Sequence, residues 1–262
     1  MDLDLSGRHA LVCGASEGIG RAAARELALL GADVTVLARR EAVLREVVAT
    51  LPRTHARQHH RFVEADLTRH AELAGDIAAL AATRPVHILV NNAGGPPPGR
   101  VIDAEPEDFL AACSLHLLAC QTLARATVPG MRAAGWGRIV NVVSTSVREP
   151  IPGLGVSNAT RAAVAGWAKT LSRELGPDGI TVNNVLPGYT RTRRLEQILA
   201  RRIEDGGGTP ACVEAAMLQD VPAARFADPA EIAAAVAFLA SPAAGYVNGV
   251  SLAVDGGRTH CI

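Results

Sequence analysis

Aromatic residues and lysine are both scarce in this chain of 262 residues. Phe, Trp and Tyr together make up 3%, the only tyrosines are Tyr189 and Tyr246, and the single lysine is Lys169. A surplus of either charge is also absent, because 26 Lys and Arg residues balance 26 Asp and Glu residues. This balance argues against a general nucleic-acid-binding surface and against electrostatic docking to a membrane.

Metal-type spacing and long apolar runs are missing as well. The five cysteines are odd in number and widely separated, and the eight histidines form no ligand pattern, so we expect free thiols and no metal site. No apolar run approaches the roughly 20 residues of a membrane span. The start, "MDLDLSG", is acidic and leads into no signal-peptide pattern. We therefore expect a cytoplasmic protein.

Short β-branched or apolar runs alternate with longer alanine-rich stretches along the whole chain. This alternation predicts right-handed crossovers and a parallel sheet that is buried on both faces. The expected fold class is α/β, a Rossmann-type doubly wound parallel sheet of about seven strands with helices on both faces. The length favours one domain, residues 1–262. Residues 191–225 carry three successive glycines after a strand, and we interpret them as a flexible substrate lid, the alternative being a surface insertion without a role.

A glycine-rich turn, "GASEGIG" from Gly14 to Gly20, joins the first predicted strand to the first predicted helix. Glycine lets the backbone approach a pyrophosphate there, and the helix start offers free N–H groups to the anion. Further motifs follow in order: "EADL" at 64–67, "NNAG" at 91–94, "GRIVNVVS" at 137–144, "PGYTRT" at 187–192 and "VDGG" at 254–257. Together they resemble the short-chain dehydrogenase/reductase family over essentially the whole chain.

The resemblance implies a nicotinamide cofactor held along these motifs. Its ligands would be Gly14, Ser16, Gly18, Ile19, Gly20, Arg39, Asp66, Leu67, Asn92, Ala93, Gly94, Arg161, Pro187, Gly188, Thr190 and Thr192. At the end of the second strand, Ala38 stands where a carboxylate would repel a 2′-phosphate, and Arg39 follows, which favours NADP(H) over NAD(H). Glu17 favours the opposite choice, because many NADP-binding relatives carry a basic residue there.

The catalytic positions depart from the family pattern. The family uses a serine, a tyrosine, a lysine four residues later, and an asparagine on the preceding long helix. Ser144 matches the serine, but the tyrosine position, thirteen residues on, is Ser157, and the lysine and asparagine positions are Arg161 and His116. Misalignment does not explain this, because four residues after each tyrosine stands Arg193 or Val250.

A serine hydroxyl is a far weaker acid than a phenol, and arginine does not titrate near neutral pH. His116 is one candidate for the replacement acid, since imidazole titrates near pH 6.5, and a purely space-filling histidine is the alternative. Tyr189 near the nicotinamide is a second candidate. Arg148 could bind an acidic substrate group, although a solvated loop charge also explains it. The loop "GGPPPGR" stiffens one wall of the cleft.

Three functions follow from these residues. The first is reduction of a small-molecule ketone, including 3-oxoacyl types, or oxidation of a secondary alcohol. The second is nucleotide binding without catalysis, and the third is a lyase or isomerase reaction in which Arg161 stabilises an enolate. Apolar residues surround the predicted helices 106–131 and 157–175, so we also expect a homo-oligomer, a dimer or tetramer.

Overall fold

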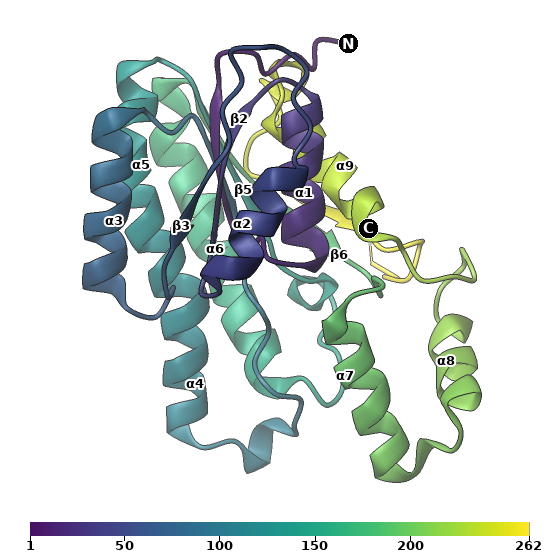
Figure 1. Ribbon diagram of the computed structural model, residues 1–262. Helices are drawn as coiled ribbons and strands as arrows, with labels where there is room; N and C mark the ends of the chain where they lie inside the picture. The colour runs from purple at the N-terminus through teal and green to yellow at the C-terminus, as the bar shows by residue number, and fades with distance from the viewer. Residues whose placement is uncertain (262) are drawn as a thin grey trace.

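Seven parallel strands form the centre of the computed structural model, which describes residues 1–261 (Figure 1). Their order is β3-β2-β1-β4-β5-β6-β7, so the chain reverses direction across the sheet between β1 and β4. The strands are β1 (His9–Cys13), β2 (Asp33–Ala38), β3 (Arg61–Glu64), β4 (Ile88–Asn91), β5 (Gly137–Val142), β6 (Ile180–Pro187) and β7 (Ser251–Val254). This arrangement confirms the predicted fold class.

Helices cover both faces of the sheet and enclose a separate apolar core on each. One core packs beneath α1 (Gly18–Leu29), α2 (Glu41–Thr50) and α9 (Pro229–Ala240). The other packs beneath α3 (His70–Thr83), α5 (Ala119–Ala133) and α6 (Gly155–Leu175). Figure 1 shows the two sets on opposite sides of the strands. The central strands are buried on both faces, which explains why they are continuously apolar in sequence.

The predicted long helix 106–131 is interrupted. It consists of α4 (Pro106–Cys113), a π-helical turn (Ser114–Leu118) and α5. The whole segment, Pro106–Ala133, is long and apolar enough to cross a membrane by length and composition, so the expectation that no segment approaches this limit is wrong. It packs against α3 and α6, and a core helix passes the same test.

A ladder of three amide side chains and one hydroxyl crosses β4, β5, β6 and β7, close to the carboxyl ends of β4 and β5. Asn91 donates to Asn141 (2.8 Å), Asn141 to Asn184 (2.9 Å), and Asn184 to the Ser251 hydroxyl (3.1 Å). Each pair is also directly in register in the parallel sheet. Because these buried amides must find hydrogen-bond partners, the ladder fixes the register of the four strands. The site described below lies at this edge.

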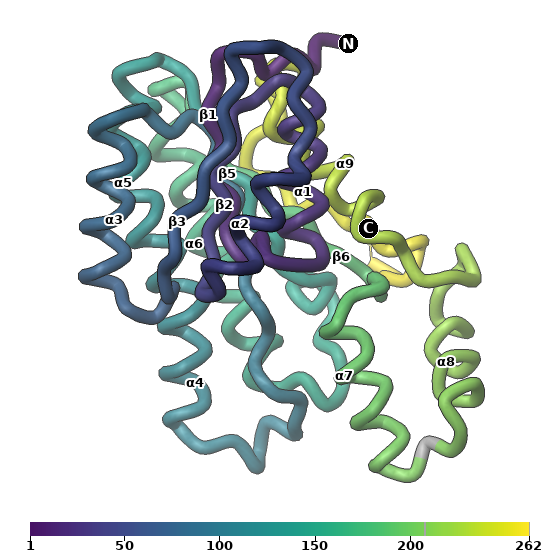
Figure 2. The backbone as a smooth tube through the Cα atoms, viewed as in Figure 1, coloured from purple at the N-terminus to yellow at the C-terminus, as the bar shows by residue number. Residues whose placement is uncertain are grey.

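Residues 191–225 fold into helices rather than an irregular loop. α7 (Arg193–Arg202) and α8 (Pro210–Gln219) project from the carboxyl edge of the sheet, as the tube in Figure 2 shows. Their apolar faces meet in a small cluster of Leu195, Val213 and Met217. The successive glycines lie between the helices, where Gly206 and Gly208 adopt positive φ. Movement of this hairpin as a lid stays a prediction.

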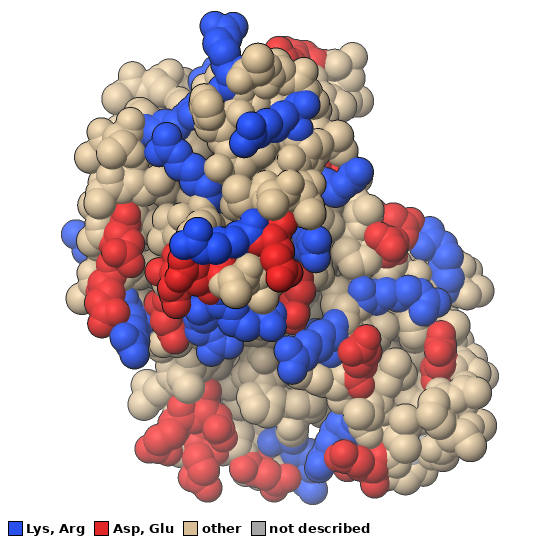
Figure 3. Space-filling view, in the orientation of Figure 1, with Lys and Arg blue, Asp and Glu red and all other residues tan. Residues whose placement is uncertain are grey.

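The charged surface matches the balanced composition. Basic and acidic side chains are interspersed over the face in Figure 3. In the described part of the chain, no group of three or more His, Cys, Asp and Glu side chains could hold a metal ion.

Candidate active site

The glycine turn between β1 and α1 is packed against the end of β4. A Cβ added at Gly20 would lie 2.3 Å from the carbonyl oxygen of Gly14, and one at Gly14 would lie 2.6 Å from that of Asn92. Gly14 and Gly18 also have positive φ, at 58° and 56°. Only glycine meets both demands. Glu17 precedes the helix without capping it by its side chain, so the first N–H groups of α1 are free for an anion.

A cleft of about 780 Å³ runs along the carboxyl edge from this turn. It gathers all the predicted cofactor residues except Gly20, which lies behind the turn: Gly14, Ser16, Gly18, Ile19, Arg39, Asp66, Leu67, Asn92, Ala93, Gly94, Arg161, Pro187, Gly188, Thr190 and Thr192. Ser144 and Ser157 line the same cleft, whereas His116 lines a small cavity behind it. The fold therefore brings the predicted residues together, and the role of each stays a prediction.

Charges at the end of the cleft near the glycine turn are largely compensated. Glu17, which favoured NAD(H) in the sequence, forms an ion pair with Arg40 at 3.1 Å. Hydrogen bonds from the Thr68 backbone and hydroxyl lower the pKa of Asp66, and the nearby charge of Arg39 lowers it further. Arg39 lines the cleft and lies beside Asp66. The carboxylate of Glu17 therefore faces a cation of its own, while Arg39 is available to a ligand.

Arg161 lies at the other end, in the second turn of α6, and is 8% exposed. Its guanidinium donates to the carbonyl oxygens of Val142 (3.1 Å) and Ala93 (3.5 Å), at the ends of β5 and β4. Burial lowers the pKa of Arg161 to about 10. No carboxylate pairs with it among residues 1–261, so a cation is held by backbone dipoles alone.

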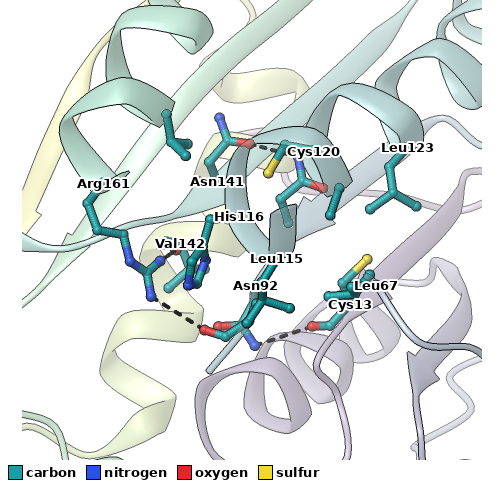
Figure 4. A pocket seen from close by; sticks show the side chains of 14 residues that line it. Cys13, Leu67, Asn92, Leu115, His116, Cys120, Leu123, Asn141, Val142 and Arg161 are labelled. Carbon is teal, nitrogen blue, oxygen red and sulfur yellow. Dashed lines mark hydrogen bonds between the residues drawn. The ribbon is translucent and has the colours of Figure 1, made fainter. Parts of the chain in front are cut away.

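A cavity of about 20 Å³ lies behind the guanidinium, between the sheet and the helices α5 and α6 (Figure 4). Three buried polar atoms that lack a hydrogen-bond partner belong to residues bordering it: Asn91 Oδ1, His116 Nε2 and Arg161 Nε. The space and its polar lining suit one bound water. Asn91 is also the last member of the amide ladder, so the ladder ends at this cavity.

His116 occupies the centre of the π-helical turn, a feature that often marks functional sites. Burial and the neighbouring charge of Arg161 lower its pKa to about 3, against a raising contribution from the Gly94 backbone. This pKa lies well below the ordinary value near 6.5, and a role of His116 as the acid stays a prediction. Its imidazole is neutral at working pH and can exchange hydrogen bonds, but it is not a ready proton donor.

Two hydroxyl groups face the same end of the cleft. Ser144 follows β5, and its Oγ accepts a hydrogen bond from the backbone N–H of Ser146 at 3.1 Å, which fixes the side chain. Ser157 lies in the first turn of α6, one turn before Arg161. The site thus offers two hydroxyl donors beside one permanent cation, and such groups stabilise a developing oxyanion.

The remaining sequence candidates lie differently. Tyr189 lines the cleft and packs edge-on against Phe226, with ring centroids 6.0 Å apart. Arg148 is exposed, donates to the carbonyl oxygen of Ser251 and does not line the cleft, which supports the solvated-charge interpretation. Sequence reasoning missed Arg193, Arg194 and Arg258, which line the cleft. The signal that could have found them is their position, because Arg193 and Arg194 follow the motif "PGYTRT" and Arg258 follows "VDGG".

The doubly wound sheet, the glycine turn and the cleft at the point of strand reversal define a dinucleotide-binding protein. A family model described as "Enoyl-(Acyl carrier protein) reductase" matches residues 14–259. The chain belongs to the short-chain dehydrogenase/reductase family.

Relatives of known sequence and structure agree with this assignment. The chain is 34% identical to "3-oxoacyl-[acyl-carrier-protein] reductase FabG" of Vibrio cholerae over 256 residues, which cover 97% of this chain and 98% of that protein. It superposes on L-sorbose reductase of Gluconobacter frateurii, solved with NADPH and L-sorbose, with a TM-score of 0.93 at 31% identity and full coverage of both chains. A gluconate 5-dehydrogenase of Burkholderia cenocepacia, in complex with NADP and tartrate, gives 0.88 at 30% identity, covering 100% of this chain and 98% of that one.

The protonation state of His116 is open to direct test. We expect the imidazole signal of His116 in NMR spectra to keep its neutral chemical shift from about pH 5 to pH 9, because burial and Arg161 disfavour the imidazolium. N-acetylhistidine in the same buffer serves as the reference, and His116→Gln assigns the signal. A His116 titration centred near the reference value would contradict the expectation.

The same pKa shift predicts a pH dependence of stability. Below about pH 6.5 the unfolded chain binds a proton at His116 and the folded chain does not, so acidification destabilises the fold through this residue.

Proposed function

We propose that the protein is an NADP(H)-dependent oxidoreductase that interconverts a small-molecule ketone and a secondary alcohol. The observation that carries this proposal is one continuous cleft, with the glycine turn and Arg39 at one end and Ser144, Ser157 and Arg161 at the other. Relatives named as 3-oxoacyl and sorbose reductases support ketone chemistry. A 3-oxoacyl compound is one candidate substrate.

The site fits the cofactor, because the glycine turn admits a pyrophosphate and the free N–H groups of α1 face it. When bound, the nicotinamide supplies or accepts the hydride. The Ser144 and Ser157 hydroxyls hydrogen-bond to the substrate oxygen, and Arg161 supplies fixed positive charge beside it. Preorganised donors of this kind contribute roughly 10²–10³ in rate each. They offset part of the ~10²–10⁴ that a missing general acid costs.

The substrate oxygen takes its proton from solvent in this scheme. Arg161 has a pKa of about 10 and His116 of about 3, so neither group changes charge near neutral pH. In this scheme His116 transfers no proton, and its neutral imidazole borders the cavity behind Arg161. The helices α7 and α8 serve as the lid, because Ile198 and Leu195 of α7 already line the cleft.

A non-redox reaction is the second candidate function. The unpaired cation of Arg161 suits an enolate as well as an alkoxide, and the absent tyrosine phenol weakens the case for the usual family reaction.

The activity test uses NADPH consumption at 340 nm with a panel of ketones, 3-oxoacyl thioesters included. We expect turnover in the wild type and a loss of about 10²-fold in Ser144→Ala, because the variant lacks a donor to the substrate oxygen. Ser6→Ala, an exposed serine far from the cleft, is the control. Cofactor binding by calorimetry without any turnover would support a binding protein instead. Product formation without an absorbance change would support a lyase or isomerase.

The choice of NADP(H) rests on Arg39. Arg39→Glu should weaken NADPH binding roughly 10- to 100-fold, the size of a lost charged hydrogen bond, and should weaken NADH binding much less. Arg25→Glu, an exposed charge reversal on α1, should change neither affinity. Calorimetry with both cofactors measures the ratio. Equal losses for NADPH and NADH would show that Arg39 does not read the 2′-phosphate.

We also propose a homo-oligomer, a dimer or tetramer, that buries the outer faces of α4, α5 and α6. Leu110 and Leu118 are 68% and 48% exposed on this side, and exposed apolar side chains of this size favour burial against a second copy of the chain. Light scattering should show a mass above 27.2 kDa, and Leu118→Glu should shift it toward the monomer. A wild type that stays at the monomer mass over the accessible concentrations would overturn the proposal.

A further inference from the structure

The two ends of the cleft differ in charge. The carboxylates that line it are Glu17 and Asp66, and both lie at the end near the glycine turn. Four further arginines line the rest of the cleft, and no acidic residue among residues 1–261 lines it with them: Arg161, Arg193, Arg194 and Arg258. The part of the cleft that would receive the substrate therefore carries positive charge that no carboxylate in its lining neutralises.

Arg258 is the cation beside the catalytic serine. Its Nη1 donates to the hydroxyl of Thr145, the residue after Ser144, at 3.4 Å, and its guanidinium carbon lies 4.7 Å from the Tyr189 ring centroid. Its Nε is buried and has no hydrogen-bond partner. One neutral hydroxyl and one aromatic ring hold the side chain, and no carboxylate among residues 1–261 forms an ion pair with it. Because Nε is shielded from solvent, a ligand in the cleft would meet the Nη groups.

The acidic residues of the surrounding segment do not neutralise Arg258. The Asp255 carboxylate accepts hydrogen bonds from the backbone and hydroxyl of Thr259, at 2.9 and 2.6 Å. Glu149 accepts from the backbone of His260 at 2.6 Å and of Cys261 at 3.0 Å. Both carboxylates thus hold the carboxyl-terminal segment in place, which positions Arg258 while leaving its charge to a ligand.

The phosphates of the cofactor do not account for Arg258 either. Thr192 lies against the glycine turn, since a Cβ at Gly18 would be 3.2 Å from its methyl group. Arg193 follows Thr192 directly in the chain, and Arg194 donates to the carbonyl oxygen of Pro96 at 2.7 Å. Arg258 lies on the other side of the cleft, between Thr145 and Tyr189.

We propose that the substrate is an oxo acid, or the corresponding hydroxy acid, whose carboxylate binds Arg258 while its carbonyl or hydroxyl oxygen lies at Ser144. A guanidinium that lines the cleft without a carboxylate partner suits a carboxylate ligand, which it attracts by its charge and binds through its Nη groups. In reduction, the carbonyl carbon gains a hydride from NADPH and the oxygen gains a proton from solvent, giving the hydroxy acid and NADP⁺. This inference rests on the proposed oxidoreductase function and adds the class of substrate.

Matched substrates test the inference. A series of 3- and 4-oxo carboxylates is compared with their methyl esters, which keep the ketone and remove the charge. We expect the wild type to prefer the acids in kcat/KM. Arg258→Gln should reduce the acid-to-ester ratio roughly 10- to 100-fold, the range of a hydrogen bond to a charged group. Arg258→Lys should retain part of the preference, because it keeps the charge but loses the paired geometry.

Arg148→Gln is the matched control, an exposed arginine nearby that does not line the cleft, and it should leave the ratio unchanged. Thermal melting and NADPH calorimetry verify that each variant folds and binds cofactor. An ester preference in the wild type, or equal losses for acid and ester in Arg258→Gln, would overturn the inference while leaving the oxidoreductase function standing.

A binding measurement distinguishes failure of the oxidoreductase function from failure of the oxo-acid inference. If no ketone is reduced, the proposed function fails, and calorimetry of 3-oxobutanoate against the NADP⁺-loaded protein decides the inference. Binding that Arg258→Gln abolishes supports recognition of an anion at this position. Absence of binding, or binding that Arg258→Gln leaves intact, overturns it.

Discussion

The buried charge of Arg161 is the constraint on which the candidate site depends. Removing a guanidinium from water without a carboxylate partner costs several kcal/mol, on the order of the whole stability margin of a domain. Two carbonyl oxygens, those of Val142 and Ala93, must therefore stay within reach of it. They lie at the ends of β5 and β4, whose level the amide ladder from Asn91 to Ser251 maintains. The register of the sheet and the position of α6 together keep the guanidinium of Arg161 within hydrogen-bond distance of these two oxygens.

The departures at the catalytic positions are linked by this charge. Arg161 helps lower the pKa of His116, which disfavours the imidazolium form that a titrating acid needs. Arginine keeps its charge in a dry pocket, where a lysine would lose its proton more readily. With Ser157 in place of a phenol, the proposed function relies on fixed donors to stabilise negative charge, rather than on proton transfer from a side chain. The changes are mutually consistent, which favours a reshaped site over simple decay.

The fold could be predicted from the sequence because its local signals agree with one another. Alternation of strand and helix patterns, the glycine turn and the asparagine-bearing strand ends all point to one sheet, and counting from Ser144 located Ser157 and Arg161 in the cleft. The protonation of His116 could not be predicted, since it depends on burial by elements that are distant in the chain. The contact between Arg258 and Thr145 spans 113 residues, and the sequence pointed to Arg148 instead. The π-helical turn also left no pattern, because its residues are ordinary helix formers.

The charge asymmetry of the cleft agrees with the proposed ligands of its two ends. At the end near the glycine turn, Arg40 compensates Glu17 and hydrogen bonds satisfy Asp66, so the protein has balanced its own charges there. At the substrate end, an oxo acid would bring one negative charge and develop a second on its oxygen during reduction. Two such charges about 6 Å apart repel by roughly 3 kcal/mol at an effective dielectric constant near 20. One cation offsets only one of them. A second, Arg258, held close to Ser144 and left unpaired by its neighbours, supplies the compensation that an anionic substrate requires and that a neutral ketone does not.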